Sequence, residues 1–317
     1  MISLLDHRWR PAPAAALFAV LLALPFIAQA LNEGFYVGLA SRVLIFALAA
    51  TSLNLILGFG GMVSFGHAAF VGVGAYSVAI LMQHGVESAW IAWPLAVLMS
   101  AAFALVIGAI SLRTKGVYFI MITLAFAQML FYVAVSLKAY GGEDGLALAA
   151  RSTIVRGMDM ANDTVFYYVV LGVAALAFAG VQRLLNARFG HALQAIRENE
   201  TRMAAIGYPV YRHKLAAFTL AGAIAGLAGV LAANQSGFVS PSLLQWSQSG
   251  MLMMMVILGG IGHLYGGIVG AAVFLLLEEV LSAHTIHWQF ALGAVLLAVV
   301  LAAPHGLAGL VRRRTNP

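Results

Sequence analysis

Several kinds of residue are scarce or missing in this chain of 317 residues. It has no cysteine, and only 9% of its residues are charged, against about 25% in a typical soluble protein. The lack of cysteine excludes a disulfide framework, a cysteine zinc site, an iron–sulfur cluster and a thiol nucleophile. The scarcity of charge excludes a soluble fold, because a soluble fold of this size needs a charged surface.

Motifs of catalysis are also missing. There is no Gly-x-x-x-x-Gly-Lys-Ser/Thr phosphate loop, so the chain is not expected to bind and split ATP itself. There is no His-Glu-x-x-His zinc pair and no Gly-x-Ser-x-Gly elbow. Ser64 and His67 are three positions apart, but two residues on one turn do not make a protease site. We therefore predict no enzyme, no bound cofactor and no metal.

Charge in the middle of the membrane is scarce as well. Glu278 and Glu279 fall near the outer end of the apolar stretch at 266–283, and Arg42 falls near the outer end of the stretch at 36–57. In these positions their side chains can snorkel or face water. A charge at the bilayer centre costs at least about 2.5–3.5 kcal/mol on insertion scales. An ion-driven carrier usually keeps a carboxylate there, so its absence argues mildly against that class of transporter.

Apolar residues are abundant. The set AVILMFWYC makes up 62% of the chain, and the mean hydropathy is +0.95. We predict an all-α, polytopic membrane bundle, with residues 1–317 as a single transmembrane domain. A spanning helix needs about 20 apolar residues. The clear candidates lie near 14–31, 36–57, 67–83, 89–112, 116–138, 164–184, 214–234, 266–283 and 287–304.

One further apolar run decides the number of crossings. The stretch from Met251 to Ile261 is too short to span alone, but it can extend back through Leu243 and Trp246, or be re-entrant. Counting it gives ten crossings. The alternative is eight or nine crossings and a re-entrant piece.

The distribution of Lys and Arg supports ten crossings with both termini in the cytoplasm. Of 17 basic residues, 13 then lie inside and 4 lie outside or near that interface. Without the short span, either the basic 185–213 loop or the Arg312–Arg314 tail would be outside. The inside residues are Arg8, Arg10, Arg113, Lys115, Arg183, Arg188, Arg197, Arg202, Arg212, Lys214, Arg312, Arg313 and Arg314, and the others are Arg42, Lys138, Arg151 and Arg156.

The first segment, residues 1–31, has two interpretations. It contains basic residues, an apolar stretch and then Ala28-Gln29-Ala30, as in a signal peptide with a small-residue cleavage site. Alanine-rich membrane segments also produce such triplets. We favour a retained first helix.

Two connections are long. Residues 139–163 are predicted outside and include Glu143 and Asp144 within a glycine-rich turn. Residues 185–213 are predicted inside and form a helix over about 192–206, with Glu198 and Arg202 as a favourable i,i+4 pair. Its apolar residues lie broadly on one side, and they are Leu193, Ile196, Met203 and Ile206. Gly207 is predicted to take the left-handed conformation that ends this helix. The helix either lies in the lipid headgroups or docks a cytoplasmic partner.

Glycine is concentrated in two membrane segments, GFGGMVSFGHAAFVGVGAY at 58–76 and GGIGHLYGGIVGA at 259–271. Glycine at four-residue spacing favours close helix packing, as for Gly262, Gly266 and Gly270. Runs such as Gly58-Phe-Gly-Gly instead predict interrupted helices, which transporters use near substrate paths. Asn54, deep in its span, either lines such a path or bonds between helices.

Six blocks of sequence resemble a known family. They are SFGHAAFVGVGAY (64–76), RTKGVYFIMITLAFAQM (113–129), GGEDGL (141–146), residues 187–231, GFVSPSLLQWSQSG (237–250) and VILGGIGHLYGGIVGAAVF (256–274). They are similar to the permeases of branched-chain amino-acid ABC importers, and most to the M-type partner of the H/M permease pair. The similarity runs from about residue 35 to the end.

The resemblance implies a helical permease of a bacterial inner membrane. It implies pairing with a second, related permease, two cytoplasmic ATPase subunits that carry ATP and Mg²⁺, and a periplasmic binding protein that delivers the substrate. It implies inward transport of branched-chain or other small amino acids; related permeases carry urea and short amides. The alternative function is an ion-coupled secondary transporter of small neutral solutes.

The same resemblance assigns roles to residues. The 185–213 loop becomes the coupling loop, with Arg197, Glu198, Arg202 and Gly207 at the ATPase. The substrate pathway is assigned to Asn54, Gly61, Ser64 and His67, and docking of the binding protein to Glu143 and Asp144. The chain departs from the family pattern at Met251, where an acidic residue is frequent, and at Gly267, where proline is frequent.

Overall fold

The computed structural model describes residues 11–30, 34–154, 159–302 and 306–307. Helices follow one another along the chain, and most begin and end within a few residues of a predicted span. In order they are α1 (Pro11–Ala30), α2 (Phe35–Asn54), the π-helix η2 (Leu55–Phe59), α3 (His67–Gln83), α4 (Ala89–Ser111), α5 (Val117–Ser136), the 3₁₀ turn η3 (Lys138–Tyr140), α6 (Asp163–Asn186), α7 (Arg188–Glu198), α8 (Glu200–Ala205), α9 (Val210–Ser236), the 3₁₀ turn η4 (Pro241–Leu244), α10 (Trp246–Gly259), α11 (Gly266–His284) and α12 (Trp288–Ala302).

Six of the helical stretches in the described residues are long and apolar enough to cross a membrane, the stretch from Phe35 to Phe59 among them. Four shorter apolar helices accompany them, within α1, α3, α10 and α12. The class of fold, an all-α membrane bundle, is confirmed. The number of ten crossings stays a prediction, as does retention of the first helix. Arg8, Arg10, Arg156 and Arg312–Arg314 lie outside the described residues, and so do both termini.

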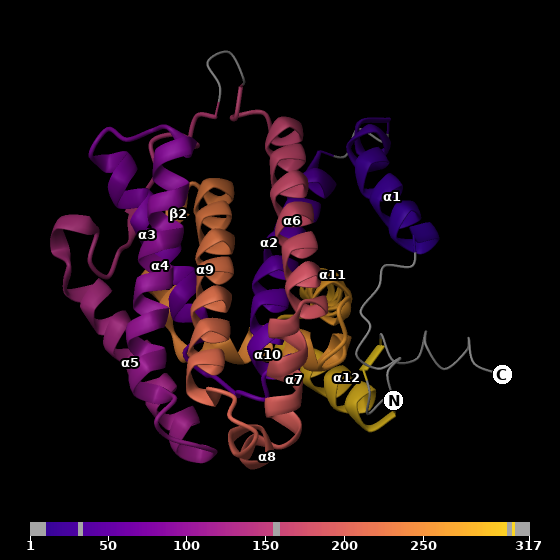
Figure 1. The fold of residues 1–317 in the computed structure, drawn as a ribbon. Helices are drawn as coiled ribbons and strands as arrows, with labels where there is room; N and C mark the ends of the chain where they lie inside the picture. The colour runs from indigo at the N-terminus through magenta and orange to yellow at the C-terminus, as the bar shows by residue number, and fades with distance from the viewer. Residues whose placement is uncertain (1–10, 31–33, 155–158, 303–305, 308–317) are drawn as a thin grey trace.

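Helix α9 is the centre of the bundle, with α3 and α4 on one side and α2 on the other (Figure 1). Its sequence explains this position, because small residues line its contact faces. A Cβ on Gly229 would overlap the carbonyl oxygen of Val71 in α3, and a Cβ on Gly222 would overlap Ala104 in α4. Small residues of this kind let helix backbones approach closely where lipid offers no hydrophobic drive.

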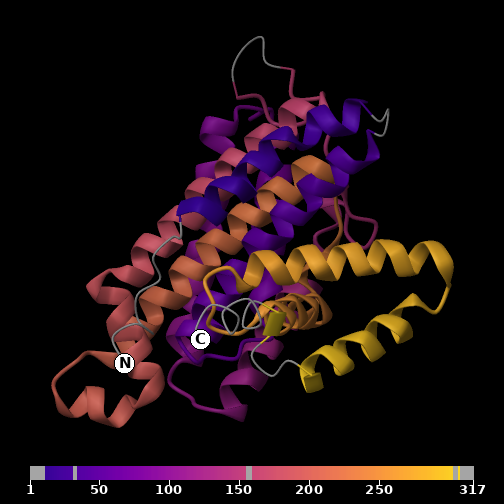
Figure 2. The ribbon, with the colours of Figure 1, turned by 90° about the vertical axis from the view of Figure 1, so that its right-hand side faces the viewer.

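Helices α11 and α12 extend to one side of the main bundle (Figure 2). They contact each other, while α11 also packs along α2 and α10. The preceding helix, α10, has 14 residues and begins at Trp246, so the short apolar run does extend back to that residue. Leu243 belongs to the separate turn η4.

Helix α1 is joined to α6 by two hydrogen bonds, one of them to a carbonyl that a proline leaves without its helical donor. Pro25 lies inside α1 and has no N–H, so the carbonyl of Leu21 loses its helical donor. The Tyr167 hydroxyl of α6 donates to that carbonyl at 2.7 Å, and the Tyr168 hydroxyl donates to the carbonyl of Leu22 at 3.1 Å. Freed backbone groups in membrane helices need such partners.

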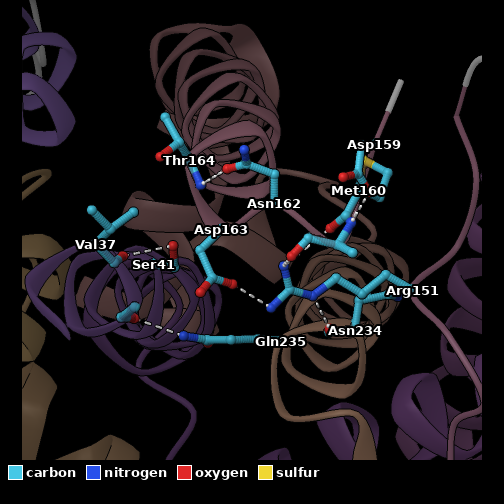
Figure 3. A network of polar contacts seen from close by, with 12 residues as sticks. Val37, Ser41, Arg151, Asp159, Met160, Asn162, Asp163, Thr164, Asn234 and Gln235 are labelled. Atoms are coloured by element: carbon cyan, nitrogen blue, oxygen red, sulfur yellow. Dashed lines mark hydrogen bonds and ion pairs between the residues drawn. The ribbon is translucent and has the colours of Figure 1, made fainter. Parts of the chain in front are cut away.

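Arg151 fixes the 139–163 loop to the bundle (Figure 3). The sequence analysis counted this residue only among the basic residues predicted outside. Its guanidinium donates to the carbonyls of Asn234 at 3.1 Å and Met160 at 3.0 Å, and to the Asp163 carboxylate at 2.7 Å. It also lies 4.5 Å from the centre of the Phe166 ring. Arg151 therefore ties this loop to the first turns of α6 and the last turn of α9. We call this the Arg151 end of the bundle.

A short strand pair completes the Arg151 end. Strand β1 (Leu146–Ala147) pairs antiparallel with β2 (Phe238–Val239), with Leu146 opposite Val239. The opposite end carries α7, α8 and the turn between α4 and α5, and we call it the α8 end.

Candidate functional site

Two helix interruptions meet near the α8 end. The first break, residues 60–66, separates η2 from α3, and the second break, residues 260–265, separates α10 from α11. Gly61, Gly260 and Gly262 have φ values of +68°, +115° and +75°, a region that side-chain-bearing residues rarely adopt. The sequence prediction of interrupted helices is confirmed. The helical packing predicted for Gly262 is wrong, because that residue lies in the second break.

Asn54 holds these segments together. Its amide Nδ2 donates to the carbonyl of His263 at 2.8 Å, and its Oδ1 accepts from the N–H of Gly262 at 3.0 Å. The side chain is 1% exposed. Gly58 allows this close approach, since a Cβ there would lie 2.5 Å from the Gly262 nitrogen. Of the two roles considered for Asn54, the structure therefore supports bonding between segments.

Arg197, at the end of α7, reaches the same place from the coupling loop. Its Nη1 donates to the carbonyl of Gly58, and it lies 3.2 Å from where a Cβ on Gly262 would stand. The methylene chain of Arg197 fills the space beside Gly61, where a Cβ would meet Cγ at 2.9 Å. One arginine thus contacts η2 and both breaks.

Ser64 and His67, the other residues assigned to the pathway, are fully buried. The Ser64 hydroxyl accepts from the N–H of Gly66 at 3.3 Å, and His67 Nε2 lies 2.8 Å from the Ser52 hydroxyl. No hydrogen bond joins Ser64 to His67 in the described part of the chain. The pathway assignment stays a prediction.

The coupling loop differs from its prediction as a single helix. Two helices, α7 and α8, are separated at Asn199, whose backbone is extended with φ −155° and ψ 96°. The Asn199 side chain accepts from the N–H of Arg202 at 2.8 Å and caps α8. Asparagine is among the best N-cap residues, and this local signal in the sequence was missed. The break also removes the i,i+4 geometry expected for Glu198 and Arg202.

Glu200, which the sequence reading did not single out, makes the ion pairs of this loop instead. Its carboxylate lies 3.1 Å from Lys115 Nζ and 2.7 Å from Lys214 Nζ. Partial burial raises the pKa of Glu200, but the hydrogen bonds and charges of Lys214 and Lys115 outweigh it, and the net pKa is below its ordinary value of 4.5. Glu200 thereby joins the start of α8 to α9 and to the α4–α5 turn.

The surface of the coupling loop is polar with two large apolar side chains at its tip. Glu198, Arg202 and Gly207 are exposed, and Gly207 has a φ of +88°, as its predicted left-handed cap requires. Leu193, Ile196 and Met203 are buried, as expected for the inward side. Ile206 was placed with them but is 65% exposed, beside Tyr208 at 43%.

Two charges in the membrane form an ion pair. Arg42 Nη2 of α2 lies 3.1 Å from Glu278 Oε1 of α11, with side-chain exposures of 40% and 15%. The second oxygen, Oε2, is buried and has no hydrogen bond within the described residues. The sequence placed both residues near the outer ends of spans but did not pair them, because they are 236 positions apart.

Other positions singled out from the sequence lie at the Arg151 end and against α2. Glu143 and Asp144 are exposed in the turn between α5 and β1, at the Arg151 end. Gly267, one of the departures from the family pattern, packs against α2, since a Cβ there would lie 2.7 Å from the Thr51 nitrogen. An almost wholly apolar cavity between α1, α2 and α6 includes Thr51 and Tyr265, but none of the assigned pathway residues lines it.

Comparison with known proteins gives the family. The model of the family described as branched-chain amino acid transport system / permease component matches residues 35–302. The chain belongs to this family. It is thus a permease subunit and not an enzyme.

Individual relatives are consistent with the M type. The chain is 28% identical to the high-affinity branched-chain amino acid transport system permease protein LivM of Escherichia coli K12, over 94% of this chain and 74% of that protein. Its identity to LivM of Salmonella typhimurium is also 28%, with the same coverage. LivH of Escherichia coli K12 is 25% identical over 83% of this chain and 91% of that protein. No solved structure matches.

Proposed function

We propose that this M-type permease subunit moves branched-chain or other small amino acids inward as part of an ATP-driven importer. The observation that carries the proposal is the family match over residues 35–302, which includes the breaks and the coupling loop. An ion-coupled carrier is not favoured, because the family is one of transport-system components.

The α8 end is where we place the ATPase subunits. Helix α8 presents Arg202 outward, and the turn that follows it exposes Gly207 together with the apolar side chains of Ile206 and Tyr208. An exposed apolar tip surrounded by polar residues is typical of a docking surface. Arg197 and Glu198 lie at the end of α7, directly before this tip. ATP and Mg²⁺ would bind to the ATPases, in agreement with the lack of a phosphate loop in this chain.

The other partners follow from the same assignment. Similarity to both LivM and LivH proteins supports pairing with a second, related permease. We place the periplasmic binding protein at the Arg151 end, where Glu143 and Asp144 are exposed. We accordingly propose that the α8 end faces the cytoplasm of a bacterial inner membrane, and from the distribution of Lys and Arg we propose the same side for both termini.

The pathway is assigned to the first break. Ser64 lies in this break, and Asn54 and His67 lie at the ends of the neighbouring helices α2 and α3. All three are buried, so a substrate would reach them only after the two breaks separate. Gly61 is exposed and marks the α8 end of this route. The apolar character of the surrounding helices suits a neutral substrate with an apolar side chain.

The function is tested by purifying the tagged chain from its native membrane in mild detergent and identifying the proteins that accompany it. We expect a second permease and ATPase subunits. The complex is then reconstituted with its binding protein and radiolabelled leucine, and uptake is expected only with ATP and Mg²⁺. A chain that purifies alone and takes up leucine without ATP would refute the proposal.

A further inference from the structure

We infer that Arg197 is the positioning residue that holds the two breaks together, and that withdrawal of its guanidinium allows them to separate at the α8 end. The inference rests on the proposed function, in which the breaks lie on the substrate route and the ATPases dock on the coupling loop that contains α7 and α8. It adds the contact through which that movement reaches the route.

Arg197 lies where the two breaks meet. Asn54 bonds the second break to the end of α2, and Arg197 contacts the same cluster from outside the membrane core through Gly58, Gly61 and the neighbourhood of Gly262. These contacts join segments 139 positions apart in the sequence. In the described part of the chain, Arg197 is the one side chain of α7 or α8 with a hydrogen bond to η2 or either break.

The hydrogen bond from Arg197 to Gly58 has a charged donor. A charged guanidinium donating to a neutral carbonyl makes a stronger hydrogen bond than two neutral groups do. The carbonyl of Gly58 belongs to a π-helix turn, where the regular helical bonding pattern has ended. Removing the guanidinium therefore leaves a backbone acceptor that has to find another donor.

The position of Arg197 also allows its release. Arg197 is exposed although its Nη1 is bonded to the Gly58 carbonyl, so a cytoplasmic partner can reach it. It is the penultimate residue of α7, two positions before the extended Asn199 that separates α7 from α8. Glu200, beyond that break, is bound separately to Lys115 and Lys214. Displacement of the end of α7 by a docked ATPase can thus withdraw Arg197 from Gly58 while the ion pairs of Glu200 remain formed.

The test uses the absence of cysteine from the natural chain. Met62 lies in the first break beside Gly61 and is 5% exposed, so Met62→Cys provides a single buried thiol. The complete transporter carrying this substitution is placed in inverted vesicles, and the rate of labelling by a membrane-impermeant maleimide is measured. Arg197→Ala is expected to raise the rate about tenfold to a hundredfold, the range that one charged hydrogen bond is worth.

Two further variants distinguish loss of the Arg197 contact from a general loosening of the folded protein. Arg197→Lys keeps a charged donor and is expected to give intermediate labelling. Arg183→Ala removes an exposed arginine near the end of α6 and is expected to leave the rate unchanged. Elution of each complex from a sizing column shows whether it is folded and assembled.

A second readout is the amount of leucine taken up per ATP hydrolysed. With Arg197→Ala we expect hydrolysis to continue and this ratio to fall about tenfold or more, with partial rescue by Arg197→Lys.

Unchanged labelling and an unchanged ratio would overturn the inference. Loss of the ATPases from the Arg197→Ala complex would also overturn it, because Arg197 would then be a docking contact. If the unmodified complex shows no ATP-driven uptake, the proposed function fails instead, while the labelling result still reports on the breaks.

Discussion

Single residues decide which segments of this permease are held together. Asn54 and Arg197 were both chosen from the sequence, Asn54 because it is a polar residue deep in its span and Arg197 because the family resemblance makes its loop the coupling loop. Their common target, the contact of Gly58 with Gly262, was not foreseen. Sequence spacing carries no information on which of two distant glycine-rich segments pack against each other.

The pair formed by Arg42 and Glu278 gives a prediction at this scale. Substituting either residue with alanine is expected to lower the free energy of unfolding in mixed micelles by about 1–3 kcal/mol, less than for a fully buried pair because Arg42 is 40% exposed. The double variant is expected to cost less than the sum of the two, since neither charge is left alone. If the loss in the double variant equals the sum of the two single losses, the interaction between Arg42 and Glu278 contributes nothing to the free energy of unfolding.

Glu200 provides a pH-dependent prediction. Its pKa is lowered in the folded protein by Lys214 and Lys115, so its ion pairs stabilise the loop above the unfolded pKa and are lost as the pH falls through the folded pKa. Below about pH 4.5 we therefore expect the loop to loosen. Glu200→Gln is expected to loosen it at neutral pH already.

Labelling of a buried position in α8 measures this loosening. Met203 is 8% exposed, so Met203→Cys should react faster with a methanethiosulfonate reagent once the loop loosens. The rate is divided by that of Thr201→Cys, an exposed position on the same helix, to remove the effect of pH on the reagent. A constant ratio between pH 7 and pH 4 would contradict the prediction.

At the scale of helices, periodicity and length located most elements well. The span predicted at 67–83 coincides with α3, and the short apolar run became α10 by extension to Trp246. The error in the coupling loop has a local cause. Helical hydrophobic spacing continued from Leu193 to Met203 and concealed the Asn199 cap, whose side chain competes with the helix for the backbone N–H of Arg202.

The packing of α9 gives a prediction with an internal control. Gly229→Ala is expected to destabilise the bundle by about 1–3 kcal/mol, because its Cβ would overlap the Val71 carbonyl and force α3 and α9 apart. Gly172→Ala, on the exposed face of α6 with no atom within 4 Å, is expected to be neutral or slightly stabilising. Thermal unfolding of both variants in detergent compares them, and equal melting temperatures would be inconsistent with close α3–α9 packing.

For the whole molecule, the structure bears on the source of energy for transport. The Glu278 carboxylate, which an ion-coupled carrier would need free, is paired with Arg42. We therefore expect the purified chain alone, in liposomes, to take up no leucine under a proton or sodium gradient. Uptake of tracer is compared with that of the complete complex supplied with ATP. Gradient-driven uptake by the single chain would favour the carrier alternative.

The sequence by itself determined the membrane class, the approximate extent of the helices, the family and the exposed position of the coupling loop. These depend on composition and on local pattern, which lie within one segment. Only the tertiary structure decided that the two breaks touch, that Arg197 reaches Gly58, that Glu278 faces Arg42 and that Arg151 fixes the opposite end. Each of these joins parts of the chain that helix packing brings together, and packing depends on the shapes of all the helices at once.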